Sequence, residues 1–168
     1  MTGGRKTVQL SSSVLTMEVP MSWKDSATDN AHWIEGPTPK GQVRLQMTSI
    51  GNAMQETTVN AIEKKAKSDA AKNPEKLTVV PLHPIGGGAK AMERREVVTA
   101  PVPREDGTME NSTVIDWSIE IFVPSDKQFT LELLHFGNIP IDQYLQDKTF
   151  LEGLLKSLRY DAAGGALK

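Results

Sequence analysis

The chain has 168 residues, and its 19 Lys and Arg against 21 Asp and Glu give a formal net charge of −2. A length of this order is typical of one domain, and 38% apolar with 24% charged residues is the composition of a soluble globular chain. The near-neutral charge argues against nucleic acid as a partner, and the absence of cysteine excludes disulfides and thiolate chemistry. We expect a single domain over residues 1–168, with frayed ends at about residues 1–5 and 162–168.

Nothing in the sequence as written directs the chain to or across a membrane. Its first twenty residues lack the continuous apolar run of about 7–15 residues that a secretory signal needs. No apolar stretch reaches the roughly 18 residues of a spanning helix. We therefore expect a cytoplasmic protein; the alternative is a periplasmic or envelope protein whose signal or lipoprotein leader was trimmed.

The first half of the chain predicts strands followed by a helix. Apolar and polar side chains alternate at residues 15–19 and 43–48, which indicates two strands, and residues 32–35 fit a short strand between them. The Gly and Pro residues of 36–41 indicate a turn. Residues 55–72 are rich in Ala, Glu and Lys, and they predict a helix that Asn73-Pro74 ends.

The next segments are less regular. Residues 77–80 fit a strand that Pro81 and Pro84 restrict to an edge or an end of a sheet. The stretch 89–99 combines helix-forming residues with Val97-Val98-Thr99, and we interpret it as a strand. Residues 100–111 contain Pro, Gly and charged side chains without periodicity, which predicts a long exposed loop.

The second half predicts an antiparallel hairpin and a C-terminal helix. Residues 112–123 and 128–136 both alternate with period two, and the four residues 124–127 between them suit a hairpin loop. A helix with a wide leucine stripe is expected from a capping box at Thr149 and Glu152, after a turn or short helix at 140–145. One apolar layer is expected to join Trp117, Ile119, Phe129, Leu131, Leu154 and Leu158.

Two phrases of the sequence resemble a known superfamily. The opening LTMEVPMSW (residues 15–23) is similar to the strand–Pro–Trp entry of PsbP-like and DcrB-like proteins, and FLEGLLKSLRY (150–160) is similar to their last helix and its exit. With the element order, the resemblance covers roughly residues 7–161. It implies an α+β fold, an antiparallel β-sheet flanked by helices on both sides in a PsbP-like α/β/α sandwich. Members include a photosystem II extrinsic protein, a Ran-binding protein and DcrB-type proteins, so it implies protein binding and no shared catalytic residue.

The motifs that could carry chemistry fit simpler interpretations. GGGAKA at residues 86–91 has the form G-x-G-x-x-A, but a dinucleotide site also needs a following helix and a later acidic residue, so we interpret it as a connection between strands. The histidines His32, His83 and His135 form no H-x-x-x-H or H-E-x-x-H pair. Asp116, Ser118 and Glu120 alternate on one strand, which is typical of a solvated face.

The leading hypothesis is a non-enzymatic protein-binding or assembly protein without catalytic residues, cofactor or metal. Its partner-binding residues are predicted in the two Pro- and Gly-rich loops and beside them, because loops on a rigid scaffold often carry function. These residues are Trp33, Pro101, Pro103, Arg104 and Met109. Two alternatives stay open: a small-ligand carrier with a pocket between sheet and helix, and an enzyme with dispersed residues around His135 or His83.

Overall fold

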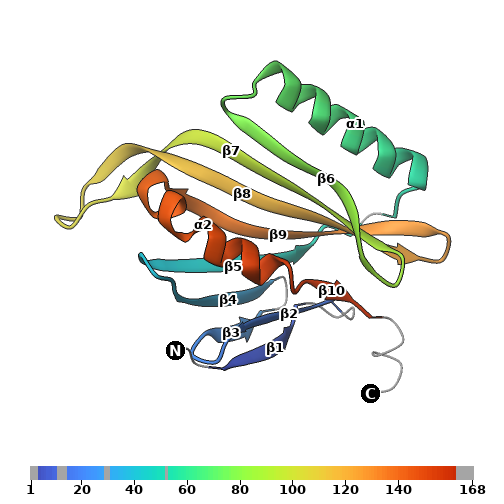
Figure 1. Cartoon of the computed structure of the whole chain (residues 1–168), viewed down its shortest axis with the longest axis horizontal. Coiled ribbons are helices and arrows are strands. Elements are labelled where there is room, and N and C mark those ends of the chain that lie inside the picture. The colour runs from blue at the N-terminus through green and yellow to red at the C-terminus, as the bar shows by residue number, and fades with distance from the viewer. Residues whose placement is uncertain (1–3, 11–14, 29–30, 52, 162–168) are drawn as a thin grey trace.

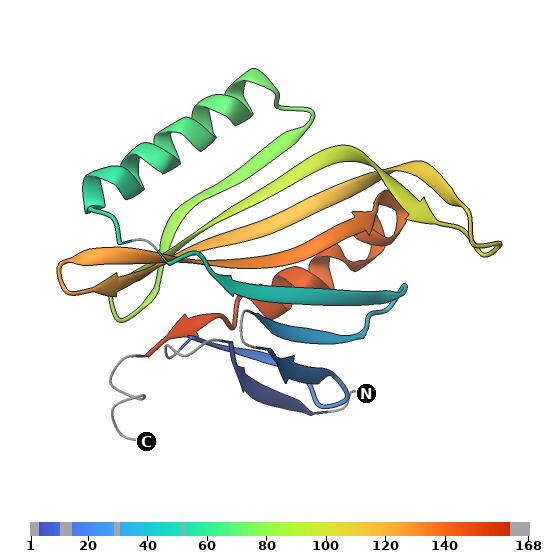
Figure 2. The ribbon, with the colours of Figure 1, turned by 180° about the vertical axis from the view of Figure 1, so that it is seen from behind.

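The structure is a computed structural model that describes residues 4–10, 15–28, 31–51 and 53–161, and these residues form ten strands and two helices (Figures 1 and 2). In chain order the elements are β1 (Arg5–Gln9), β2 (Leu15–Pro20), β3 (Lys24–Ala27), β4 (His32–Pro37), β5 (Gln42–Ser49), α1 (Glu56–Lys72), β6 (Leu77–Gly86), β7 (Ala89–Pro103), β8 (Met109–Ser125), β9 (Gln128–Pro140), α2 (Ile141–Leu155) and β10 (Arg159–Tyr160). The α+β class is confirmed. Of the frayed ends that the sequence predicts, residues 1–3 and 162–168 lie outside the described residues, and Arg5 already belongs to β1.

The strands form two antiparallel sheets. The larger has the order β3-β4-β5-β9-β8-β7-β6, and the smaller has the order β1-β2-β10. Figure 1 shows α2 lying across one face of the larger sheet, with the smaller sheet near the C-terminal end of that helix. The two-residue strand β10 follows α2 closely and pairs with β2, with Tyr160 opposite Leu15. The C-terminal end of the described chain is thereby held against a strand near its N-terminal end.

The predicted hairpin is the centre of the larger sheet. Its strands are β8 and β9, both longer than the sequence indicates, and its turn has two residues rather than four, Asp126 and Lys127, both with positive φ. On β9 a bulge follows, because Trp117 pairs with Gly137 while Ser118 pairs with His135. Gly137 takes a positive φ of 79°, which a glycine adopts without strain.

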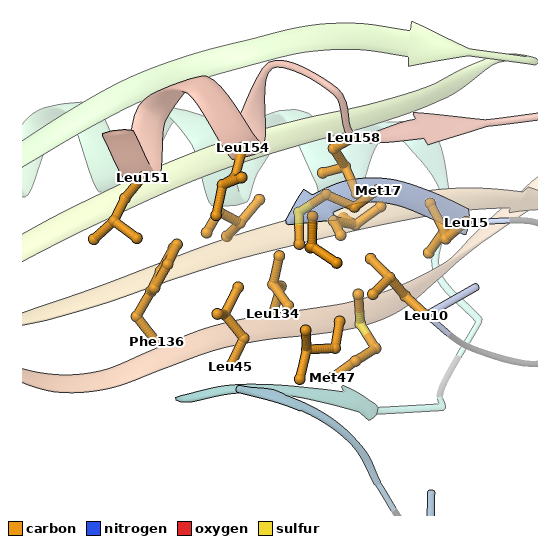
Figure 3. Packing of buried hydrophobic residues seen from close by; sticks show 14 of the residues in the cluster. Leu10, Leu15, Met17, Leu45, Met47, Leu134, Phe136, Leu151, Leu154 and Leu158 are labelled. Carbon is orange, nitrogen blue, oxygen red and sulfur yellow. The ribbon is translucent and has the colours of Figure 1, made fainter. Parts of the chain in front are cut away.

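The main core lies between the larger sheet on one side and α2 with the smaller sheet on the other. In Figure 3 Leu151 and Leu154 of α2 point toward the sheet residues Phe136, Leu134 and Leu45. The odd-numbered apolar residues of β8 contribute to the same cluster, as the sequence predicts: Ile115, Trp117, Ile119, Ile121 and Val123.

The predicted apolar layer is right for β8, for Leu154 of α2 and for Leu158 just after this helix, but wrong for β9. Leu134 stands opposite Ile119 and belongs to the core, whereas Leu131 stands opposite Phe122 on the other face of the sheet. Phe129 shares that second face, because it lies two residues before Leu131 on the same strand.

Helix α1 begins and ends close to the predicted residues and contacts β6 and β9. Its Val59 and Ala66 are buried, although neither belongs to the main core cluster. Helix α2, by contrast, begins at Ile141 with Pro140 as its N-cap residue, so Thr149 and Glu152 lie within the helix and form no capping box. The turn or short helix that the sequence predicts at residues 140–145 is the first part of α2.

Glycines connect β6 to β7, as the sequence predicts. Gly86, Gly87 and Gly88 all have positive φ. A Cβ atom on Gly86 would lie 2.7 Å from the carbonyl oxygen of Tyr160. The glycines therefore allow both the tight turn and the close approach of β10.

Candidate functional site

The segment 100–111, predicted as a loop, is instead a two-stranded arm. β7 and β8 stay in uniform antiparallel register from Lys90↔Phe122 to Pro103↔Met109. Their neighbours end earlier: β6 ends its pairing at Leu77↔Glu96, and β9 ends at Val114↔Pro140. Residues 99–113, which we call the arm, thus extend beyond the sheet as a ribbon that Figures 1 and 2 show in yellow.

The prolines of the arm are the reason why the sequence of residues 100–111 predicts a loop. Pro101 is paired with Asn111 and Pro103 with Met109. A proline has no N–H, so both must occupy pairs whose backbone groups point away from the partner strand. Pro101 and Pro103 are two residues apart, so both fall on outward-pointing positions of the uniform register. The ribbon therefore loses no hydrogen bond between its two strands.

Four of the five predicted partner-binding residues lie together at the tip of the arm. Pro101, Pro103 and Met109 belong to its strands, and the Met109 side chain is 60% exposed. The Arg104 guanidinium donates to Glu110 through Nε at 3.0 Å and through Nη2 at 2.7 Å. Arg104 is therefore occupied by the arm itself, where it braces the turn.

The fifth predicted residue, Trp33, does not join them. It lies on β4 opposite Gln46, and the register continues through His135 to Ser118. Along β8, Ser118 lies five residues from Thr113, the nearest arm residue on that strand. Trp33 lies three strands further across the sheet. The Arg44 guanidinium lies 3.7 Å from the Trp33 ring centroid, so this pair forms a separate surface feature.

The other predicted binding loop, residues 36–41, is held down by α2. Asp147 is fully buried, and its carboxylate accepts hydrogen bonds from the Thr38 hydroxyl and from the Lys40 backbone N–H at 2.9 Å. The Gln143 amide also donates to the Gln42 carbonyl at 2.9 Å. This turn is fixed against the body of the protein and is less available to a partner than the arm.

A groove lies between β6 and α2, and sequence reasoning did not identify the residues that line it. It has a volume of about 660 Å³, with an apolar wall of Val80, Pro81, Leu82 and Leu155. Glu93, Arg95 and Glu152 also line it, together with His83 and Lys156. The position fits the pocket between sheet and helix that a carrier needs.

A hydrogen-bonded ionic cluster forms part of the groove lining. Arg95 bonds Glu93 at 2.7 Å, the Tyr144 hydroxyl at 3.0 Å and Glu152 at 2.7 Å, while the Trp117 indole N–H donates to the same Glu93 oxygen at 2.6 Å. The guanidinium carbon also lies 4.1 Å from the Trp117 ring centroid. These partners come from β7, β8 and α2, so the cluster ties the helix to the sheet. Only the alternation of β7 could have indicated that Glu93 and Arg95 face the core.

The electrostatics of this cluster hold Arg95 in its charged form. Burial by itself lowers the pKa of Arg95, but the hydrogen bond that it donates to the Tyr144 hydroxyl and the Glu93 and Glu152 carboxylates outweigh burial, so the pKa is raised above its usual value. A guanidinium that is always charged and already bonded on three sides neither donates nor accepts a proton in a reaction. The cluster is suited to bracing and orienting, not to acid–base chemistry.

The two candidate histidines face opposite sides of the larger sheet. His83 pairs with Ala91 on the core face and lines the groove. His135 pairs with Ser118 on the other face, where its Nε2 lies within hydrogen-bond distance of an Asp116 carboxylate oxygen. The structure therefore does not bring these histidines together, and among the described residues no group of three or more His, Asp and Glu side chains is placed to hold a metal ion.

Comparison of the chain with protein-family models, with curated proteins and with solved structures found no match. Within the described ranges, no helix combines the length and the apolar character needed to cross a membrane.

Proposed function

We propose that the protein is a non-enzymatic binding or assembly protein that docks a partner protein through the arm, on a PsbP-like sandwich with helices on both sides of its sheet. The observation that carries the proposal is the projection of residues 99–113 beyond both neighbouring strands. A two-stranded ribbon outside a sheet gains little burial from its own fold, so its apolar tip side chain at Met109 is available to another surface.

The arm is suited to binding because its structure is already formed before a partner docks. Its strands stay paired to Pro103↔Met109, and the Arg104–Glu110 pair braces the turn. Two prolines restrict the backbone further. A preformed ribbon loses less conformational entropy on docking than a flexible loop does, which leaves more of the contact energy for affinity.

Shortening the arm tests this proposal. Replacement of residues 101–110 by a Gly-Ser link should leave the melting temperature nearly unchanged, because these residues lie outside the core cluster. Capture of the partner in affinity purification from the native source should fall at least tenfold, equivalent to about 1.4 kcal/mol.

The matched control alters another exposed hairpin turn, with Asp126 and Lys127 both replaced by glycine, which keeps the positive φ values. This variant should capture the partner as well as the parent does. Undiminished capture by a folded, arm-shortened protein would contradict the proposal and move the contact elsewhere, for example to the polar sheet face with Asp116, Ser118 and Glu120.

The groove favours a second candidate function, that of a small-ligand carrier. Its volume of about 660 Å³ and its apolar wall suit a small molecule. Native mass spectrometry of protein purified from its source would support this candidate by a discrete mass above that of the bare chain. A mass equal to that of the chain would favour the docking function alone.

A further inference from the structure

Most outer edges of the larger sheet are blocked against pairing with another strand. The edge strand β6 contains Pro81 and Pro84, and the Leu82 backbone N–H is bonded to a Glu63 carboxylate oxygen of α1 at 2.7 Å. The opposite edge strand, β3, has four residues and carries Lys24 and Asp25. Short strands, prolines and charges are the usual means by which proteins prevent edge-to-edge association.

The β7 edge of the arm is blocked in the same way. Because Pro101 and Pro103 lack an N–H, the odd-numbered residues of β7 are the ones whose backbone groups point away from β8. Two of these positions in the arm therefore have no donor. The third is Thr99, and Val97, the next such position toward the sheet, already donates its N–H to the Lys76 carbonyl at 2.8 Å.

The β8 edge of the arm is different. By the same register, Met109, Asn111 and Thr113 point their backbone N–H and C=O groups away from β7. No described strand pairs with them there, since the β9 ladder ends at Val114↔Pro140. Residues 109–113 contain no proline and no lysine or arginine, and their one charged side chain, Glu110, is bonded to Arg104.

We infer that a second copy of this chain pairs with residues 109–113 through the same residues of its own β8 edge. This pairing joins the two arms into one continuous antiparallel sheet. The inference deepens the proposed function, on which it rests, by naming the partner of the arm. A two-fold axis through Asn111 places Asn111 opposite itself and Met109 of one copy opposite Thr113 of the other. All three outward-pointing residues then meet outward-pointing residues, as an antiparallel ladder requires.

Charge selects this register over its neighbour. When the axis passes through Asn111, Glu110 of one copy faces Ser112 of the other. A shift of the axis to Glu110 would place two carboxylates directly opposite each other, which destabilises a strand pair. Five residues per copy bury less surface than a standard interface, so the dimer should be weak and dependent on concentration.

Matched proline substitutions on the two edges test the inference. Asn111→Pro removes the central outward N–H of β8 and no hydrogen bond within the arm, whereas Thr99→Pro does the same on the β7 edge; both side chains are exposed. In sedimentation velocity, the parent and Thr99→Pro should shift from monomer to dimer over roughly a hundredfold range of concentration. Asn111→Pro should raise the dimer Kd at least tenfold at an unchanged melting temperature.

A parent that stays monomeric over this range, or equal dimerisation by folded Asn111→Pro and Thr99→Pro variants, would overturn the second-copy inference. The proposed function is judged separately by the arm-shortened protein. If the parent is monomeric while arm shortening still abolishes partner capture, then the arm binds a different protein. If arm shortening changes nothing, then the proposed function itself is wrong.

Discussion

Replacing Trp117 by alanine is expected to lower the free energy of unfolding by about 3–5 kcal/mol. The side chain is fully buried, stacks on Phe136 with ring centroids 4.6 Å apart, and bonds Glu93 through its indole N–H. Truncation leaves a cavity and removes one hydrogen bond from a buried carboxylate, and both effects destabilise the fold.

Urea denaturation of the Trp117→Ala variant measures this loss, and Trp33→Ala is its control. Trp33 is only partly buried and contacts the exposed Arg44, so its truncation should cost no more than about 1 kcal/mol. Equal midpoints for the two variants would show that Trp117 is not the centre of the core.

Replacing Arg95 by methionine is expected to cost about 2–4 kcal/mol. The substitution leaves the Glu93 carboxylate largely buried without its cation, and an uncompensated buried charge is strongly destabilising. The expected value lies below that of a fully buried pair because the second carboxylate, Glu152, is 39% exposed.

The double variant Glu93→Gln with Arg95→Met separates lost charge pairing from lost packing. The Glu93→Gln side chain keeps an acceptor for the Trp117 indole but carries no charge, so thermal denaturation should show the double variant to be more stable than Arg95→Met alone. Arg104→Met is the control, since both partners of that ion pair are 51% exposed, and it should change stability by less than about 1 kcal/mol. Equal losses for Arg95→Met and the double variant would show that the cluster stabilises through packing alone.

The local patterns of the sequence predict α1 and seven of the ten described strands, but they miss the short strands β1, β3 and β10 and do not predict the register between strands. On β9, Phe129, Leu131 and Leu133 look like a core face, yet the core residues of this strand are Leu134, Phe136 and Ile139. Both faces of β9 carry apolar residues, so only the long-range pairing of Ile119 with Leu134 decides which face is buried.

The candidate site shows the same limit. The sequence locates the arm residues Pro101, Pro103, Arg104 and Met109, but their prolines favour a loop. Prolines fit the ribbon only because each occupies an outward-pointing position, and that depends on the β7–β8 register. The groove depends on contacts between β6, β7 and α2, which lie far apart in the chain, and no local motif marks it.

Cross-linking from the tip of the arm tests the central claim most directly. A photo-reactive amino acid in place of the exposed Met109 is compared, in cells of the native source, with the same amino acid in place of Lys127 at the β8–β9 turn. The account predicts a discrete covalent protein adduct from position 109, to a second copy or to another protein, and none from position 127. No adduct at position 109, or equal adducts at both positions, would contradict the assignment of the arm as the docking element.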